Sequence, residues 1–167
     1  MIVLGLDPGS QYTGYGVIRL VPGAIEYVSS GVIKTGNQQE FASKLSEISR
    51  QLESLYSEFN PRVTVVEKVF LGKNADSAFK LGHVRGVCLM QAACHQNKLV
   101  EIAARKAKKL VTGSGNASKE HMQFLVQQIL DIDVFSTLDE SDALGLCIAF
   151  WKLSIEEVAK SRVQGEL

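Results

Sequence analysis

The apolar run at the start of the chain, Ile2–Leu6, is the feature that most limits the possible folds. A short continuous apolar run stopped by Asp7-Pro8-Gly9 is typical of a buried strand that ends in a turn. Two further strand-like segments follow, Thr13–Leu20 and Ala24–Lys34, and only Val21-Pro22-Gly23 separates them. Connections this short predict that the first three strands form an antiparallel meander.

The rest of the chain alternates helix-like and strand-like patterns. Six apolar residues recur at alternating steps of four and three and predict an amphipathic helix over 40–59: Phe41, Leu45, Ile48, Leu52, Leu55 and Phe59. We then expect a strand at 63–67, a helix at 74–96, a strand at 99–102, and helices at 118–130 and 138–153. This order predicts an α/β domain over 1–155, in which helices flank a five-stranded mixed sheet. The polar tail, 156–167, is expected to be frayed.

Composition fits one cytosolic domain. The 167 residues are 46% apolar, which is enough for a substantial core. No apolar stretch reads as a membrane span or a secretory signal, so we expect a cytoplasmic protein that does not contact a membrane. The three cysteines, Cys88, Cys94 and Cys147, lie in apolar helical patterns without metal-ligand spacing. They are expected to be buried thiols in a reducing compartment.

Charge is unevenly distributed although the formal net charge is zero. Residues 61–120 hold 11 Lys and Arg against 4 Asp and Glu. Such a segment can bind phosphates because charges are screened beyond about 8 Å in cells, so a partner responds to local charge. Taken alone, this pattern is more typical of an ordinary solvated surface.

Two acidic residues end two of the predicted strands. Asp7 closes the first strand and Glu67 closes the fourth. If these strands are parallel neighbours, both carboxylates reach the same edge of the sheet, where open α/β sheets bind their ligands. Each acid alone also has an ordinary explanation, since Asp7 could cap its turn and Glu67 could simply be exposed.

A capping box, Thr137-Leu138-Asp139-Glu140, predicts a helix start near residue 138. Asp139 and Asp142 are three residues apart, so they lie on one face of this helix. The same face continues through apolar residues that should dock on the core: Leu146, Ala149 and Leu153. The helix dipole accounts for acids in a first turn, but it does not account for acids on the buried side.

Four carboxylates gathered at one sheet edge would repel one another unless a cation lies among them. Hard oxygen ligands suit Mg²⁺ or Mn²⁺. Two such ions about 4 Å apart would activate a water and stabilise the leaving oxygen in phosphodiester hydrolysis. The sequence offers no serine or cysteine nucleophile, and the histidines are expected to be surface or packing residues: His83, His95 and His121.

Ordered blocks of this sequence resemble the RuvC family of Holliday-junction resolvases. In chain order they are Leu4-Gly5-Leu6-Asp7-Pro8-Gly9-Ser10 with Thr13-Gly14-Tyr15-Gly16-Val17-Ile18, Glu67-Lys68-Val69-Phe70, Lys73-Asn74-Ala75-Asp76-Ser77-Ala78 with Leu81-Gly82, Ala103-Ala104-Arg105, and Asp139-Glu140-Ser141-Asp142-Ala143-Leu144. The blocks have the family's spacing over roughly residues 1–153.

The resemblance implies an RNase H-like fold and a homodimer that acts on four-way DNA junctions in recombination and repair. Such an enzyme cuts two strands of like polarity symmetrically and leaves 5′-phosphates and 3′-hydroxyls. The family's catalytic acids, which would hold Mg²⁺ (or Mn²⁺ in its place), correspond to Asp7, Glu67, Asp139 and Asp142. The resemblance also implies two ions per site and a branch-migration helicase as a partner.

The resemblance further implies catalytic roles for Lys108 and Lys119, since an ammonium near the scissile phosphate offsets charge in the transition state. By residue type alone, Lys108 belongs to an ordinary solvated basic cluster. DNA contacts are implied for Phe70, Lys73, Asn74 and Arg105. Phe70 would stack on a base, worth roughly 1–3 kcal/mol, although it could instead pack under the long helix.

Two further features bear on DNA binding and assembly. Gln11 stands where many relatives have a basic residue, which predicts weaker or more salt-sensitive binding. The predicted helix at 74–96 carries Gly82 and Gly86 on one face, although a helical glycine costs about 1 kcal/mol relative to alanine. Close approach of either the sheet or a second copy of the chain would explain this pattern, and the sequence leaves both open.

Three other interpretations compete with a junction resolvase. Actin-like ATPases and sugar kinases also place Asp-x-Gly after a first strand, but they need two such lobes around a nucleotide. A metal-free junction-binding module would keep the acids only for structure. A related RNase H-like nuclease would act on RNA or on other branched DNA.

Overall fold

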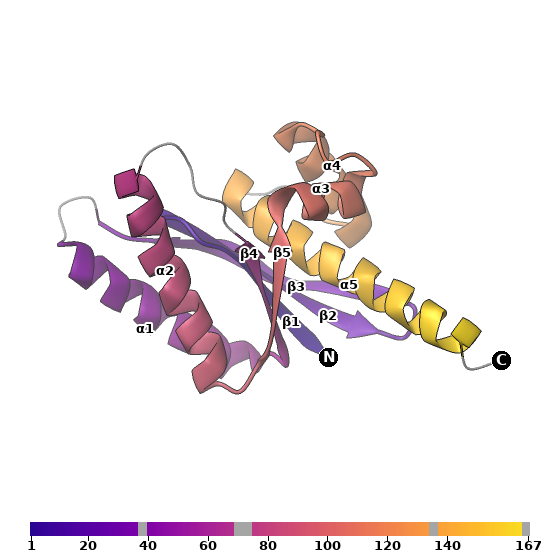
Figure 1. The fold of residues 1–167 in the computed structure, drawn as a ribbon, viewed down its shortest axis with the longest axis horizontal. Helices are drawn as coiled ribbons and strands as arrows, with labels where there is room; N and C mark the ends of the chain where they lie inside the picture. The colour runs from indigo at the N-terminus through magenta and orange to yellow at the C-terminus, as the bar shows by residue number, and fades with distance from the viewer. Residues whose placement is uncertain (37–39, 69–74, 134–136, 165–167) are drawn as a thin grey trace.

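The computed structural model describes residues 1–36, 40–68, 75–133 and 137–164, with side chains as far as residue 161. Its centre is a five-stranded sheet in the order β3-β2-β1-β4-β5 (Figure 1). The strands are β1 Ile2–Asp7, β2 Tyr12–Val21, β3 Ala24–Lys34, β4 Val63–Lys68 and β5 Lys98–Ala103. β1, β2 and β3 are antiparallel, whereas β4 runs parallel to both β1 and β5. The predicted mixed sheet is therefore confirmed.

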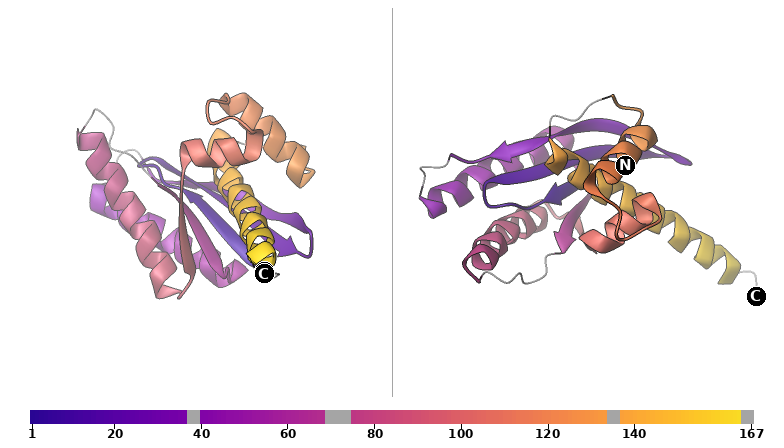
Figure 2. Two further views of the ribbon diagram at one scale, coloured as in Figure 1. Left: turned by 45° about the vertical axis from the view of Figure 1, so that its right-hand side comes forward. Right: turned by 90° about the horizontal axis from the view of Figure 1, so that it is seen from above.

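Helices cover both faces of the sheet. They are α1 Phe41–Phe59, α2 Ala75–Cys94, α3 Ala104–Thr112, α4 Lys119–Leu130 and α5 Leu138–Gln164. Figure 2 shows α1 and α2 on one face, and α3, α4 and α5 on the other. Among the described residues, no helix combines the length and the apolar character that crossing a bilayer requires.

The sheet separates two hydrophobic cores because successive strand residues point to opposite faces. Leu4 and Val66 belong to the core under α1 and α2. Val3 and Val65, each one residue earlier in its strand, belong to the core under α3, α4 and α5. Central strands buried on both faces account for the continuous apolar runs in the sequence.

Two helices differ from the sequence prediction. α3 was not predicted, because only Ala107 and Val111 of its nine residues are buried and the remainder is largely basic. α5 was expected to end at residue 153, but it continues to Gln164. The segment expected as a frayed tail is thus helical through residue 164, which agrees with the helix propensity of its Glu, Ala and Lys residues.

The cysteines also differ in part from expectation. Cys88 and Cys147 are buried free thiols, as predicted. Cys94 is exposed, so the prediction for this residue was wrong. It is the last residue of α2, and it lies after the last buried residue of that helix, Ala92.

Glycines allow α5 to cross the sheet closely. A Cβ on Gly5 would overlap the carbonyl oxygen of Ala143, and a Cβ on Gly14 would overlap that of Asp139. By contrast, among the described residues, no atom beyond the chain neighbours and the nearby backbone of α2 lies within 4 Å of a Cβ built on Gly82 or Gly86. Packing against the sheet therefore does not explain the glycines of α2, and this alternative from the sequence was wrong.

Candidate active site

Asp7 and Glu67 lie side by side because their strands are parallel neighbours. Leu6 of β1 pairs with Val66 of β4, so the next residue of each strand reaches the same edge of the sheet. A cavity of about 230 Å³ opens there. Its walls come from β1, β4, α3, α4 and α5, through Asp7, Glu67, Ala104, Ala107, Lys108, Lys119, Met122, Asp142 and Leu146.

The acidic residues raise one another's proton affinity. Burial, and then the charges of Glu67, Asp142 and Asp139, raise the pKa of Asp7 to about 8, while Lys119 opposes this effect. Burial and the charge of Asp142 likewise raise the pKa of Glu67, against a hydrogen bond from Asp7 and the charges of Lys119 and Lys108. Burial and the neighbouring acids therefore outweigh the lysines, so the carboxyl groups of Asp7 and Glu67 hold their protons more tightly than in water.

The two lysines approach the acids from α3 and α4. Lys119 begins α4, and its Nζ lies 3.3 Å from Oδ2 of Asp142. This carboxylate raises the pKa of Lys119, which keeps its ammonium charged. Ser118 caps the helix by accepting the backbone N–H of His121 at 3.2 Å, so Lys119 is held in the first turn. Lys108 reaches the cavity from α3, beside the buried Ala107.

The start of α5 is fixed by its cap and by the sheet. The backbone N–H of Glu140 donates to Oγ1 of Thr137 at 3.4 Å, as the capping box predicts. The Glu140 carboxylate accepts hydrogen bonds from two hydroxyl groups, that of Thr137 at 3.3 Å and that of Ser30 of β3 at 3.2 Å. These contacts orient Asp142 into the cavity, whereas Asp139 lies outside its lining but close enough to raise the pKa of Asp7.

The donor set fits a hard divalent cation. Carboxylate oxygens are the ligands that Mg²⁺ and Mn²⁺ prefer, and burial together with the neighbouring acids raises the pKa of Asp7, which a bound cation would lower. In the described part of the chain, no three Asp, Glu, His or Cys side chains stand close enough to enclose an ion. The acids thus line an open cavity, which leaves room for water and substrate oxygens.

The residues implied to contact DNA are placed differently. Phe70, Lys73 and Asn74 lie outside the described residues. Arg105 is exposed on α3 and lies outside the cavity lining, with its side chain against Gly115. Met122 was not singled out from the sequence, although it lines the cavity. A methionine in a helical apolar pattern is usually a core residue, so nothing in the sequence indicates that Met122 lines a cavity.

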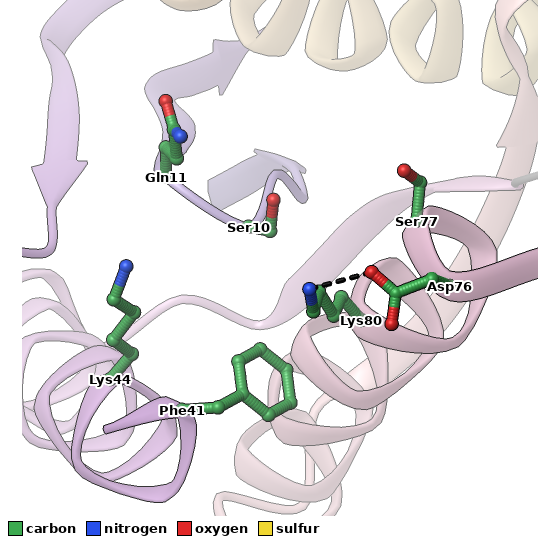
Figure 3. Close-up of a pocket in the computed structure, with 7 residues that line it drawn as sticks. All are labelled: Ser10, Gln11, Phe41, Lys44, Asp76, Ser77 and Lys80. Carbon is green, nitrogen blue, oxygen red and sulfur yellow. Dashed lines mark hydrogen bonds and ion pairs between the residues drawn. The ribbon is translucent and has the colours of Figure 1, made fainter. Parts of the chain in front are cut away.

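A second cleft, of about 350 Å³, opens at the loop that follows Asp7 (Figure 3). Ser10 and Gln11 of this loop face the first turns of α1 and α2 across it. The cleft is lined by Ser10, Gln11, Phe41, Lys44, Asp76, Ser77 and Lys80. Lys80 pairs with Asp76 at 2.6 Å, and Lys44 extends from α1 on the opposite side. Neither lysine was singled out from the sequence.

Comparison with known proteins places this chain in a family. The family profile described as crossover junction endodeoxyribonuclease RuvC matches residues 3–150. Proteins of that name from Bdellovibrio bacteriovorus and Vibrio vulnificus are 42% and 41% identical to the chain. The first match covers 87% of this chain and 87% of the Bdellovibrio protein. The second covers 88% of this chain and 84% of the Vibrio protein.

Solved structures show the same fold. The RuvC structure from Thermus thermophilus matches with a TM-score of 0.85 at 23% identity, covering 94% of this chain and 97% of that one. The same protein in complex with a Holliday junction substrate matches with a TM-score of 0.84 at 21% identity, covering 93% and 96%. The predicted RNase H-like fold is confirmed, and the chain belongs to the RuvC family of crossover junction endodeoxyribonucleases.

Proposed function

We propose that this protein resolves four-way DNA junctions by metal-dependent hydrolysis of two phosphodiester bonds placed symmetrically about the crossover. The observation that carries the proposal is the 230 Å³ cavity in which Asp7, Glu67 and Asp142 meet Lys108 and Lys119. Acids that raise one another's pKa, with cations beside them, suit phosphodiester chemistry at a metal site.

Each charged residue of the cavity has a distinct task. Asp7, Glu67 and Asp142, with Asp139 at the margin, would hold Mg²⁺, for which Mn²⁺ would substitute. Two bound ions would supply an activated water and stabilise the leaving oxygen. Lys119 is held by Asp142, and Lys108 lies beside Glu67, so both ammonium groups stand where the scissile phosphate gains negative charge.

The protein acts as a homodimer in this proposal, with α2 at the contact between copies. The phenyl ring of Phe79 is 70% exposed, and Met90 is 49% exposed on the same helix. Gly82 and Gly86 leave room beside them for another chain. A two-fold axis through this contact would space two identical cavities for paired cuts.

DNA backbone contacts extend from the cavity to the second cleft. Lys44 and Lys80 line that cleft beside Gln11, where they replace the positive charge that Gln11 lacks. Phe70, Lys73, Asn74 and Arg105 contribute further contacts, with Phe70 stacked on a base at the crossover. The partner is a branch-migration helicase, and the reaction takes place in the cytoplasm.

The decisive experiment incubates the purified protein with a synthetic mobile junction, with and without Mg²⁺. We expect paired symmetric nicks with Mg²⁺ or Mn²⁺, and binding without cutting in Ca²⁺. Asp7→Asn and Glu67→Gln should abolish cutting and preserve binding. Cutting by either variant, or unpaired nicks from the wild-type protein, would contradict the proposal.

A related RNase H-like nuclease with another substrate is the second candidate, since the same cavity suits any phosphodiester. Competition among a four-way junction, a flap and an RNA–DNA hybrid separates the two. A junction that competes no better than the flap or the hybrid favours the second candidate. Junction binding without any metal-dependent cleavage would favour a non-catalytic module.

A further inference from the structure

Arg85 connects α2 to the strand that carries Glu67. It lies near the middle of α2, and its side chain is only 23% exposed. Its Nε donates to the backbone carbonyl oxygen of Glu67 at 3.4 Å. Its Nη2 forms an ion pair with Oε1 of Glu101 on β5. One guanidinium thus joins the helix to two adjacent strands.

The contact reaches Glu67 from the opposite side of the sheet to its carboxylate. Val66 packs in the core under α1 and α2, where the neighbours of Arg85 on α2, Val84 and Cys88, are buried. The Glu67 side chain lines the cavity on the α3–α5 side. Arg85 therefore holds the backbone of Glu67 and leaves its carboxylate oxygens free for the cavity.

The backbone at the end of β4 is fixed by few contacts within the sheet. Glu67 and Lys68 are the last residues of the strand, and they pair with Ile102 and Ala103 of β5 on one side. On the β1 side, the paired residues end with Leu6 and Val66. The carbonyl of Glu67 belongs to the last peptide within the strand, which joins Glu67 to Lys68, and the orientation of this peptide affects the direction of the Glu67 side chain.

Arg85 contacts Glu67 at the backbone carbonyl, and its charge is paired with Glu101. The cations that lower the pKa of Glu67 are Lys119 and Lys108, both on the cavity side. A guanidinium held in place by Glu101 instead constrains geometry. Partners that hydrogen-bond metal-holding residues typically change metal affinity or activity by 10–100-fold when removed.

We propose that Arg85 is a positioning residue that sets the direction of the Glu67 carboxylate by holding its backbone carbonyl, with Glu101 holding Arg85. This inference rests on the proposed function, in which Glu67 holds a metal ion. It assigns to α2 a role in the chemistry, although no side chain of α2 lines the acidic cavity among the described residues.

The test compares Arg85→Gln with Arg85→Lys and with Arg50→Gln as a matched control. Arg50 also pairs with a glutamate, Glu47 at 2.7 Å, but on the exposed surface of α1. Three quantities are measured: the single-turnover rate of junction cutting, junction affinity in Ca²⁺, and Mn²⁺ binding to the DNA-free protein by electron paramagnetic resonance.

We expect Arg85→Gln to lower both the cutting rate and the Mn²⁺ affinity by about 10-fold, with junction affinity unchanged. Arg85→Lys should recover part of both losses because it keeps one charged donor. Glu101→Gln should give a smaller loss, and it should add little to Arg85→Gln because it acts through the same guanidinium. Arg50→Gln should behave as wild type.

Wild-type Mn²⁺ affinity in Arg85→Gln would overturn the inference, whether or not cutting and junction binding fall. If Arg85→Gln fails to fold, Arg85→Lys and Glu101→Gln provide the same measurements. A wild-type protein that cuts no junction would refute the proposed function. The Mn²⁺ measurement without DNA would then still decide the role of Arg85.

Discussion

At the scale of single residues, Asp7 is the most informative group in the molecule. Its pKa is raised from 3.8 to about 8, first by burial and then by the other acids. Between these two values the folded protein keeps a proton that the unfolded chain has lost. The contribution of Asp7 to stability is therefore present at low pH and falls as the pH rises from about 4 to 8.

We therefore expect Asp7→Asn to stabilise the metal-free protein at pH 9, where it removes a buried, repelled charge. The melting temperature should rise by several degrees, at roughly 2–4 °C for each kcal/mol. At pH 5 the gain should be much smaller because Asp7 is already protonated there. Calorimetry in EDTA at both pH values measures the difference, and an equal gain at the two would contradict the shifted pKa.

Lys44 and Gln11 give a second prediction at this scale. If the cleft in Figure 3 binds DNA phosphates, Lys44→Ala should weaken junction binding and lower the slope of log affinity against log salt by about 1. Gln11→Arg should change both in the opposite direction. Arg19→Gln is the control because Arg19 pairs with Glu26 on the β2–β3 hairpin. If Lys44→Ala leaves the slope of log affinity against log salt unchanged, this cleft does not bind DNA phosphates.

At the scale of elements, α5 approaches the sheet closely beside the acids that we propose to be catalytic. A Cβ on Gly14 would overlap the carbonyl of Asp139 and lie 3.2 Å from its Cβ, so the first turn of α5 would have to move. Backbone cannot yield as a flexible side chain does, and overpacking of this kind costs typically 1–3 kcal/mol.

Gly14→Ala should therefore leave the protein folded but lower its cutting rate by at least about 10-fold, since small misplacements of catalytic groups are costly. Junction affinity in Ca²⁺ should change much less than the rate. A reduced cutting rate with nearly unchanged junction affinity would show that the acids of α5 are displaced while DNA binding is retained. A normal rate in a stably folded Gly14→Ala would show that α5 tolerates the shift.

Elements with regular patterns could be predicted from the sequence, whereas α3 could not. The five strands and α1, α2 and α4 were predicted to within a few residues, because their apolar residues follow the periods of strands and helices. α3 offers only two buried residues, and α5 continues after its buried face ends. Neither α3 nor the end of α5 therefore shows the hydrophobic periodicity from which a helix can be predicted.

At the scale of the whole molecule, the sequence placed Asp7 and Glu67 together only on the condition that β1 and β4 are parallel neighbours, and it did not predict which helices wall the cavity. That Asp7 and Glu67 share an edge followed from parallel pairing of β1 and β4, which the structure confirms. Met122, Arg85 and Lys44 come from helices whose rotation about their axes only packing decides. Their positions therefore could not be deduced from spacing along the chain.

The exposed face of α2 gives a prediction about assembly. Phe79→Glu should leave the melting temperature of the isolated chain nearly unchanged, because this ring is 70% exposed. If α2 is the contact between copies, the variant should be monomeric in analytical ultracentrifugation and should nick junctions singly. A dimeric Phe79→Glu that still makes paired cuts would exclude this face as the contact.

The division of the interior into two cores by the sheet has a consequence for how this protein tolerates sequence change. Among the described residues, the core under α1 and α2 contributes no side chain to the acidic cavity, whereas the other core contributes Ala107, Met122 and Leu146. Substitutions within the first core can accumulate during divergence and reshape assembly while hydrolysis persists. Arg85, which joins α2 to the backbone of Glu67, is where such drift should be least tolerated.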